Sequence, residues 1–300
     1  MSGEIEGMSG AVGFIGLGNI GAPMATRLLD WPGGLVVFDV HGPSVEPFVE
    51  KGATAATSPA GVAESAEVIC IVVQNEAQVR EVLDGPDGIL RTARAGTVVA
   101  VHSTISAEGA AALAGLAEGS QVEVVDAPIS GGAMGAHSGT LAVMLGASDA
   151  AAQRVRPVLE RFASLVQHMG PIGAGTRTKI ARNLISFAGF AVAGEAQRLA
   201  EAAGLDLLKL GEVVRHSDAV TGGPGAIMVR PTAAPMDESD GLRPIFDHSR
   251  SLGEKDLELA RAMAAKLGVD VPFAALAQQW LPIALGLVDP PSGGSGGSGA

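Results

Sequence analysis

Residues 11–25 read "AVGFIGLGNIGAPMA", and they give the clearest indication of how the first part of the chain folds. Its first five residues form an apolar run typical of a buried strand, and residues 22–30 have the apolar spacing of a helix. Between the two, Gly16, Gly18 and Gly21 spell GxGxxG, which permits a tight turn and lets a pyrophosphate approach the backbone. We therefore predict a dinucleotide-binding strand–turn–helix unit. The residues predicted to contact the dinucleotide are Gly16, Leu17, Gly18, Asn19, Ile20 and Gly21.

An acidic residue at the end of the next apolar run supports this interpretation. Asp39 closes "LVVFD", and such a carboxylate can accept hydrogen bonds from ribose hydroxyls while repelling a 2′-phosphate. No arginine follows closely, since the next residues are "VHGPS". The pattern favours NAD as the cofactor and leaves NADP possible. The alternative is a turn that binds no nucleotide, but the motif, its context and Asp39 together favour the dinucleotide.

The rest of the first half alternates apolar runs with helical segments. The runs are "LVVFDV", "EVICIVV", "GTVVAVHS", "QVEVVDAPI" and "TLAVMLGA". Continuous β-branched runs separated by helices are typical of a parallel sheet covered on both faces. We expect residues 10–170 to form a Rossmann domain, a doubly wound and mainly parallel α/β fold.

The pattern then changes to helical spacing of apolar residues, without a convincing strand. We expect residues 171–290 to form an all-helical domain for substrate binding and dimerisation, joined to the first domain by a long helix. A Gly/Pro-rich loop with a short helix is expected near its middle. Residues 291–300, "PSGGSGGSGA", have the composition of a flexible tail added for expression.

Composition excludes several classes of protein. The 300 residues are 47% hydrophobic and 17% charged, which is typical of a globular chain, and the net charge of −12 argues against a nucleic-acid surface. No apolar run reaches the roughly 20 residues of a membrane span, and no metal-ligand spacing links the histidines, so we predict neither a membrane segment nor a metal. The single cysteine, Cys70, is expected to be buried in a strand. One cysteine suits a reducing compartment, so we expect a cytoplasmic protein.

The stretch "GAGTRTKIARNL" at residues 173–184 places Lys179 and Asn183 one turn apart at the head of an apolar helix. Taken alone, such residues are more often solvated or capping. Glu195 lies within the apolar part of this helix and must be paired or face an interface, because a lone buried carboxylate is costly. Residues 184–203 carry apolar side chains on nearly every side of the expected helix, which also predicts packing against a partner.

Four motifs, taken together and in order, resemble the β-hydroxyacid dehydrogenase family, which includes 3-hydroxyisobutyrate dehydrogenase and tartronate semialdehyde reductase. They are "GFIGLGNIGAPMA" (13–25), "DAPISGGAMGAHSGTL" (126–141), "GAGTRTKIARNLI" (173–185) and "KDLELA" (255–260). The resemblance implies a catalytic lysine, here Lys179, and a homodimer or higher homo-oligomer. The residues that it implies for substrate binding are Ser130, Gly131, Gly132, Asn183 and Phe246, with core packing an equal possibility for Phe246. Those that it implies near the cofactor are Ser103, Thr104 and Lys255.

The implied roles suit the chemistry of these groups. A base that removes a hydroxyl proton works best with a pKa nearer neutrality than the roughly 10.4 of a free lysine, and burial or a nearby cationic ring would lower it. The amide of Asn183 can orient a substrate without adding charge. A hydroxyl and approachable backbone N–H groups at Ser130–Gly132 can hold a carboxylate.

We therefore predict an NAD(P)-dependent oxidoreductase that transfers a hydride between nicotinamide and a small anionic 3-hydroxy acid, or its semialdehyde or keto partner. Imine reductases share the fold and most motifs but typically carry another residue at the lysine position. A catalytically silent dinucleotide-binding protein is the other alternative, and such relatives lose the lysine. Arg182 and Val101 depart from the pattern of the hydroxyisobutyrate enzymes, so the particular hydroxy acid stays open.

Overall fold

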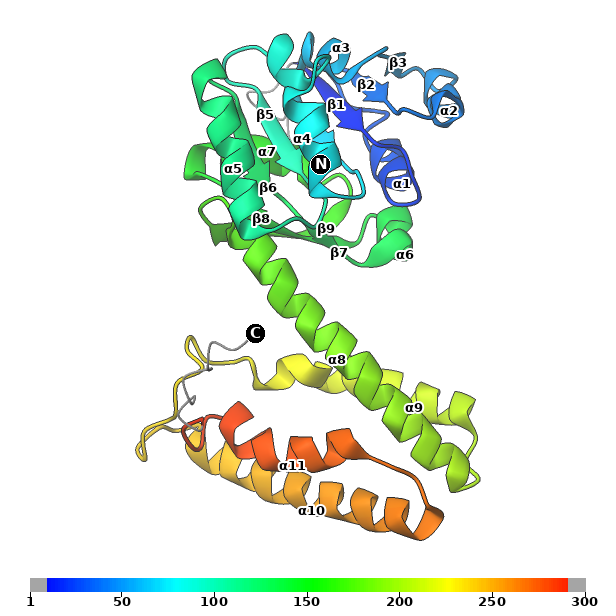
Figure 1. The fold of residues 1–300 in the computed structure, drawn as a ribbon, viewed down its shortest axis with the longest axis vertical. Coiled ribbons are helices and arrows are strands. Elements are labelled where there is room, and N and C mark those ends of the chain that lie inside the picture. Colours follow the sequence, from blue (N-terminus) through cyan, green and yellow to red (C-terminus); the bar gives the residue numbers. More distant parts are fainter. Residues whose placement is uncertain (1–9, 291–300) are drawn as a thin grey trace, which may run out of the picture. The chain divides into compact units, whose positions relative to one another are not determined.

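The computed structural model describes residues 10–290, and the chain divides between Asn183 and Leu184 into two units (Figure 1). The first unit carries a nine-stranded sheet of order β3-β2-β1-β4-β5-β6-β8-β7, with β9 paired to β8. The strands are β1 (Ala11–Ile15), β2 (Leu35–Phe38), β3 (Thr54–Ala55), β4 (Ala66–Ile71), β5 (Val98–Val101), β6 (Glu123–Asp126), β7 (Ile129–Ser130), β8 (Leu141–Gly146) and β9 (Ala163–Gly170). The pairs that β8 makes with β6 and β7 are antiparallel and the other pairs are parallel. The predicted mainly parallel sheet is confirmed.

Helices and short helical turns connect these strands. The helices are α1 (Gly21–Thr26), α2 (Glu46–Val49), α3 (Pro59–Ala63), α4 (Glu76–Asp84), α5 (Ala107–Ala117), α6 (Gly132–Ser138) and α7 (Asp149–Leu159), and the 3-10 turns are η1 (Gly42–Ser44), η2 (Ile89–Arg91) and η3 (Glu118–Ser120). Because β1 lies between β2 and β4, the strand order reverses there. In a doubly wound sheet, ligands bind outside the carboxyl ends of the strands at such a reversal.

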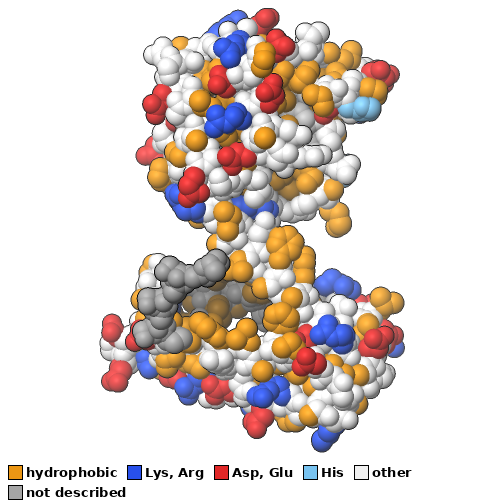
Figure 2. All heavy atoms as spheres, in the orientation of Figure 1, with side chains coloured by type: hydrophobic (Ala, Val, Ile, Leu, Met, Phe, Trp, Pro, Cys, Tyr) orange, Lys and Arg blue, Asp and Glu red, His pale blue; other side chains and the backbone are white. Residues whose placement is uncertain are grey.

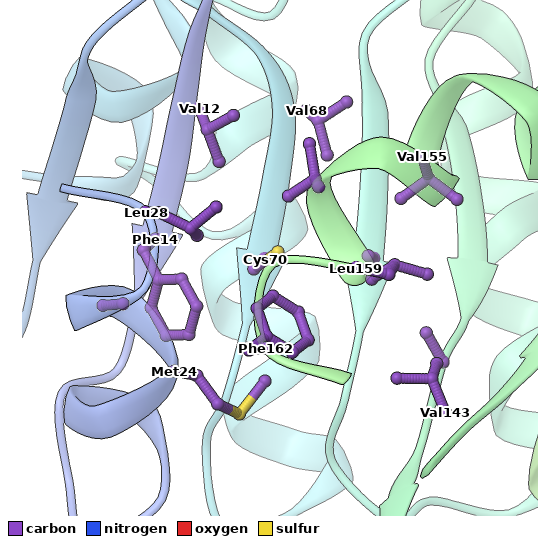
Figure 3. Packing of buried hydrophobic residues seen from close by; sticks show 14 of the residues in the cluster. Val12, Phe14, Met24, Leu28, Val68, Cys70, Val143, Val155, Leu159 and Phe162 are labelled. Atoms are coloured by element: carbon purple, nitrogen blue, oxygen red, sulfur yellow. The ribbon is translucent and has the colours of Figure 1, made fainter. Parts of the chain in front are cut away.

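Alternate residues of the central strands enter two separate cores, one on each face of the sheet. In β4, Val68 and Cys70 pack with the cluster that contains α1 and α7, whereas Ile69 and Ile71 pack with the cluster of α3, α4 and α5. Figure 3 shows the first cluster, in which Cys70 lies near Phe162. Since both faces are buried, the strands need apolar residues at every position, which explains the unbroken runs in the sequence. Cys70 is fully buried, as predicted, and burial raises its pKa to about 12.

Three strands were not predicted. β3 and β7 have two residues each, too few to show a pattern. β9 pairs with β8 and leaves Leu165 and Met169 exposed, so its sequence lacks the continuous apolar run of the inner strands.

Within residues 184–290 the second unit contains helices and loops and no strand, as predicted, and the longest loop covers residues 228–242. It contains most of α8 (Ala174–Ala202), then α9 (Leu207–Thr221), the 3-10 turn η4 (Gly223–Ile227), α10 (Arg243–Leu267) and α11 (Pro272–Ala284). The carboxylate of Glu195 is 4% exposed and accepts the backbone N–H groups of Phe273 and Ala274, at 2.9 and 2.8 Å. These are unpaired donors in the first turn of α11, so Glu195 has the partner that its burial required. Within residues 10–290, no helix is long and apolar enough to cross a bilayer.

Candidate active site

A cavity of about 520 Å³ opens where the strand order reverses, beside the loops that follow β1, β2 and β4. Its lining includes Gly16, Gly18, Asn19, Ile20, Gly21 and Asp39, all predicted to bind the dinucleotide. Leu17 behaves differently, because its side chain is 4% exposed and belongs to the core. Its backbone N–H donates to Asp39 Oδ2 at 2.6 Å, so Leu17 contributes to the loop through its backbone.

The three glycines of the loop have different surroundings. A Cβ on Gly16 would lie 2.0 Å from the carbonyl oxygen of Val72, and Gly16 has a φ of +96°. A Cβ on Gly21 would lie 1.9 Å from the carbonyl oxygen of Gly16, whereas one on Gly18 would meet no atom within 4 Å. Gly16 and Gly21 are therefore needed for the turn itself. Gly18 leaves space in the cavity that a side chain would fill, and this open backbone surface fits a pyrophosphate.

Asp39 connects the two loops that border the cavity. Besides the bond from Leu17, its Oδ1 accepts the backbone N–H of His41 at 2.7 Å. Asp39 also lines a neighbouring cavity of about 900 Å³, whose lining includes Glu46 and Glu50. Carboxylates therefore surround the end of β2.

Lys179 lies in the second turn of α8 and is half-buried. Its Nζ donates to the carbonyl oxygen of Ile129 at 2.6 Å, which brings it next to Ser130, the second residue of β7. Burial, and secondarily the positive charge of Arg182, lowers the pKa of Lys179 below its usual value. Lysine and serine, 49 positions apart in the sequence, are thus brought into one neighbourhood.

The loop after β7 adopts backbone angles that favour glycine. Gly131 has a φ of +128° and Gly132 a φ of +62°, and α6 begins directly at Gly132. Asn183 follows Lys179 by one turn of α8 and is partly exposed. The structure therefore groups Lys179 with the loop Ser130–Gly132, and Asn183 continues the same helix.

Ser103 and Thr104 follow β5, and their side chains differ in exposure. The hydroxyl of Ser103 donates to the carbonyl oxygen of Val73 at 2.7 Å and accepts the Val73 N–H at 3.0 Å. These bonds join the segments after β4 and β5, and Val73 itself lines the dinucleotide cavity. Thr104 is exposed. Ser103 thus holds the cavity wall through Val73, and contact of either residue with a nicotinamide stays a prediction.

Two predicted residues belong to the second unit. Phe246 on α10 is 7% exposed and packs with the buried Met236, Leu285 and Leu287. Lys255 on the same helix forms an exposed ion pair with Asp256, with Nζ and Oδ1 3.2 Å apart. Their roles toward substrate and cofactor stay predictions.

Family models match both halves of the chain. Residues 11–170 match the NAD-binding domain of 6-phosphogluconate dehydrogenase, and residues 173–288 match the NAD-binding domain of NADP-dependent 3-hydroxyisobutyrate dehydrogenase. A 3-hydroxyisobutyrate dehydrogenase of Pseudomonas aeruginosa is 35% identical over 89% of either chain. The chain belongs to the β-hydroxyacid dehydrogenase family.

This β-hydroxyacid dehydrogenase is also similar to an uncharacterized oxidoreductase of Mycobacterium tuberculosis. The two are 55% identical over 93% of the present chain and 94% of the mycobacterial one. The crystal structure of an oxidoreductase from Mycobacterium avium has the same fold, with a TM-score of 0.87 and 49% identity over 92% of this chain and 98% of that one. The enzyme is thus an oxidoreductase that acts on hydroxyl groups with NAD(P). The two family models meet at residues 170–173 of the dehydrogenase, immediately before α8 begins.

The buried polar residues of the dehydrogenase include His102 and Asp126. His102 is 3% exposed, its Nδ1 lies 2.7 Å from the carbonyl oxygen of Ala127, and its ring meets Phe162 edge-on. Burial lowers the pKa of His102 to about 4, so at neutral pH the ring is uncharged. Asp126, 1% exposed, is the first residue of the motif "DAPISGG". Its place at the start of this motif could have indicated a structural role for Asp126, because a buried carboxylate next to a glycine-rich loop needs hydrogen-bond partners.

Proposed function

We propose that this enzyme interconverts a small anionic 3-hydroxy acid and its semialdehyde or keto form, with NAD as the preferred cofactor and Lys179 as the general acid/base. One observation carries the proposal. The amine of Lys179 is half-buried and donates to Ile129, directly beside the loop Ser130–Gly132. A group that can transfer a proton thus lies next to a loop that can bind a carboxylate. The nicotinamide, when bound, would supply the other part of the reaction, the transfer of a hydride.

Lys179 can serve in both directions of this reaction. In oxidation, its neutral amine takes the proton from the substrate hydroxyl. Burial and Arg182 favour this neutral form, because both disfavour the charged ammonium. In reduction, the ammonium returns a proton to the oxygen of the carbonyl as that oxygen gains negative charge. A pKa below that of a free lysine makes the neutral amine more available at a given pH, which suits a general base.

The remaining site residues would bind and orient the substrate. The hydroxyl of Ser130 and the backbone N–H groups of Gly131 and Gly132 would hold the carboxylate, since the two glycines let the backbone approach an anion closely. Asn183 would orient the hydroxyl-bearing carbon by donating from its amide. In residues 171–290, which we propose as the substrate and dimerisation domain, Phe246 and Lys255 would contribute an aromatic contact and a cofactor contact.

The preference for NAD rests on charge at the end of β2. Asp39 can accept the ribose hydroxyls, and the neighbouring Glu46 and Glu50 add negative charge where a 2′-phosphate would lie. We expect kcat/KM with NAD⁺ to exceed that with NADP⁺ by about tenfold or more, a difference of roughly 1.4 kcal/mol.

A panel of small hydroxy acids tests the function. The acids carry the hydroxyl on the second, third or fourth carbon, with one or two carboxylates, and reduced nicotinamide is followed by its absorbance with each cofactor. We expect 3-hydroxy acids to turn over and simple alcohols without a carboxylate to fail. Imine reductases share this fold, so cyclic imines are included in the reductive direction. Turnover of imines with none of any hydroxy acid would contradict the proposal, as would cofactor binding without turnover on the whole panel.

We also propose that the enzyme is a homodimer whose interface lies on the second unit. Its buried apolar core consists of Met236, Phe246, Leu285 and Leu287, and large apolar side chains remain exposed on its helices. Figure 2 shows hydrophobic side chains gathered over this part of the chain. On α8, Phe187 and Phe190 meet edge-on and are 63% and 69% exposed. Exposed apolar surface of this extent marks an interaction site, and two copies related by symmetry would cover it.

Sedimentation of the intact chain is expected to give twice the monomer mass of 30.0 kDa. The double substitution Phe187→Glu, Phe190→Glu should shift the equilibrium toward monomer, because burying two carboxylates in an apolar interface is costly. The control is Gln197→Glu, which adds one charge at an exposed polar position of the same helix. A monomeric parent protein, or a double variant that keeps the parent mass, would contradict this interface.

A further inference from the structure

The buried carboxylate of Asp126 holds the first turn of α8. Its Oδ1 accepts the backbone N–H of Gly173 at 2.7 Å, and its Oδ2 accepts that of Thr176 at 2.6 Å. Asp126 is 1% exposed. Donors in the first turn of a helix have no partner within the helix, and hydrogen bonds to an ionised acceptor are about twice as strong as neutral ones. Asp126 therefore fastens the start of α8 to the end of β6.

The packing around these bonds leaves the helix start little freedom. A Cβ on Gly146 of β8 would lie 2.1 Å from Oδ1 of Asp126, and one on Gly175 would lie 2.2 Å from the carbonyl oxygen of Met144. The first turn of α8 thus lies with its backbone directly against β6 and β8. At Gly175 the helix backbone lies against the backbone of the strands, so this close contact and the two hydrogen bonds of the carboxylate together hold the start of α8.

Lys179 lies on the next turn of this helix, four residues after Gly175. Its Nζ donates to the carbonyl oxygen of Ile129, three residues after Asp126. The segment 126–129 therefore holds α8 at two points, first through the carboxylate and then through the carbonyl that receives the catalytic amine. A rotation or shift of the first turn would move Lys179 relative to Ile129 and to the neighbouring Ser130.

We propose that Asp126 is a positioning residue, which sets the place and the burial of the Lys179 amine through the first turn of α8. This inference rests on the proposed role of Lys179 as general acid/base. Asp126 acts without touching substrate or cofactor. The dinucleotide cavity is not lined by Asp126 or by its partners Gly173 and Thr176.

The substitution Asp126→Asn tests this role. Asparagine has the same shape, but its amide nitrogen would face one of the two backbone N–H groups, so one bond is lost and two donors are opposed. We expect kcat of the oxidation to fall about tenfold or more, since small misplacements of a catalytic group are costly. The Kd of NADH should change less than about twofold, because the loops that line the cavity are untouched.

The pH profile gives the readout that a purely structural role would not move. Oxidation requires neutral Lys179, so the rate rises as pH increases through the pKa of this lysine. In the parent enzyme, burial is the larger cause that lowers this pKa, and the positive charge of Arg182 on the same helix is the smaller one. The group of β7 that faces the amine is the uncharged carbonyl of Ile129. A displaced and better-solvated lysine returns toward its usual pKa. The acid limb of the log kcat profile should therefore shift upward by about half a pH unit or more in the Asp126→Asn enzyme.

Glu195 supplies a matched control, because its carboxylate also accepts two backbone N–H groups at a helix start, that of α11. It lies 16 residues after Lys179 on α8, roughly 24 Å along the helix at 1.5 Å per residue. Glu195→Gln should lower Tm and leave the acid limb in place. Thr176→Ala perturbs the first turn of α8 more mildly, since it removes only the methyl group and the unpartnered hydroxyl of a fully buried side chain. It should shift the limb in the same direction by less, and it keeps the test decisive if Asp126→Asn does not fold.

Three outcomes overturn the inference. An acid limb that stays in place in folded Asp126→Asn enzyme would do so, whatever its kcat. If that enzyme does not fold, an unchanged limb in Thr176→Ala would do so. An equal shift in Glu195→Gln would show that general destabilisation is the cause. In each case, an inactive Lys179→Ala enzyme measured in parallel would leave the proposed function standing. Full turnover by Lys179→Ala would overturn the proposed function and this inference together.

Discussion

Replacing Lys179 by methionine is expected to lower kcat by about 10²- to 10⁴-fold, the range that general acid–base groups contribute. Methionine retains most of the length and apolar stem of lysine but can neither take nor give a proton. The Kd of NADH should stay within about twofold, because Lys179 does not line the dinucleotide cavity. Stopped-flow or steady-state absorbance of the nicotinamide measures the first quantity, and fluorescence titration measures the second.

Two further measurements make this result specific to proton transfer. Lys209→Met makes the same chemical change at a side chain that is 81% exposed, and it should leave kcat unaltered. Lys179→Ala leaves space for a small primary amine, so added ethylamine should restore part of the oxidation rate, more strongly at higher pH where the free amine is neutral. A Lys179→Met enzyme with parental kcat would remove this lysine from the mechanism.

Two alanine substitutions in the same glycine motif should fail in different ways. Gly16→Ala forces a Cβ to within 2.0 Å of the Val72 carbonyl oxygen at a φ of +96°. The left-handed backbone alone costs roughly 1–2 kcal/mol, and displacing the end of β4 adds to this. We expect a Tm lower by many degrees and little cofactor binding. Gly18→Ala meets no atom within 4 Å, so its Tm should stay near that of the parent enzyme.

The added methyl group of Gly18→Ala nevertheless occupies space in the cavity where the pyrophosphate is expected. We expect the Kd of NADH to rise about tenfold or more in a protein that remains folded. Calorimetry and fluorescence titration of both variants separate the two effects. A stable Gly16→Ala protein would show that the turn can move, and tight binding by Gly18→Ala would place the pyrophosphate elsewhere.

Much of the first unit was predictable because its chemistry is local in the sequence. The apolar runs of β4 and β5 have no polar alternation, since Val68 to Ile71 alternate between two buried cores. GxGxxG and Asp39 lie at the ends of consecutive strands, so their meeting at one edge of the sheet follows from the parallel connection. Lys179 was found by the order of four motifs, because the helix containing it would by itself suggest only a solvated lysine.

The two-part architecture, the family and the dinucleotide loop could be inferred from the amino-acid sequence, because periodicity and short spacings report elements that bury apolar residues locally. The hydrogen bonds that join distant positions become visible only in the folded chain: Asp126 to the start of α8, Ser103 to Val73, and Glu195 to the start of α11. Such bonds form because a buried carboxylate or hydroxyl must find a donor or acceptor wherever the fold brings one. The partner is selected by proximity in space, which no local pattern encodes.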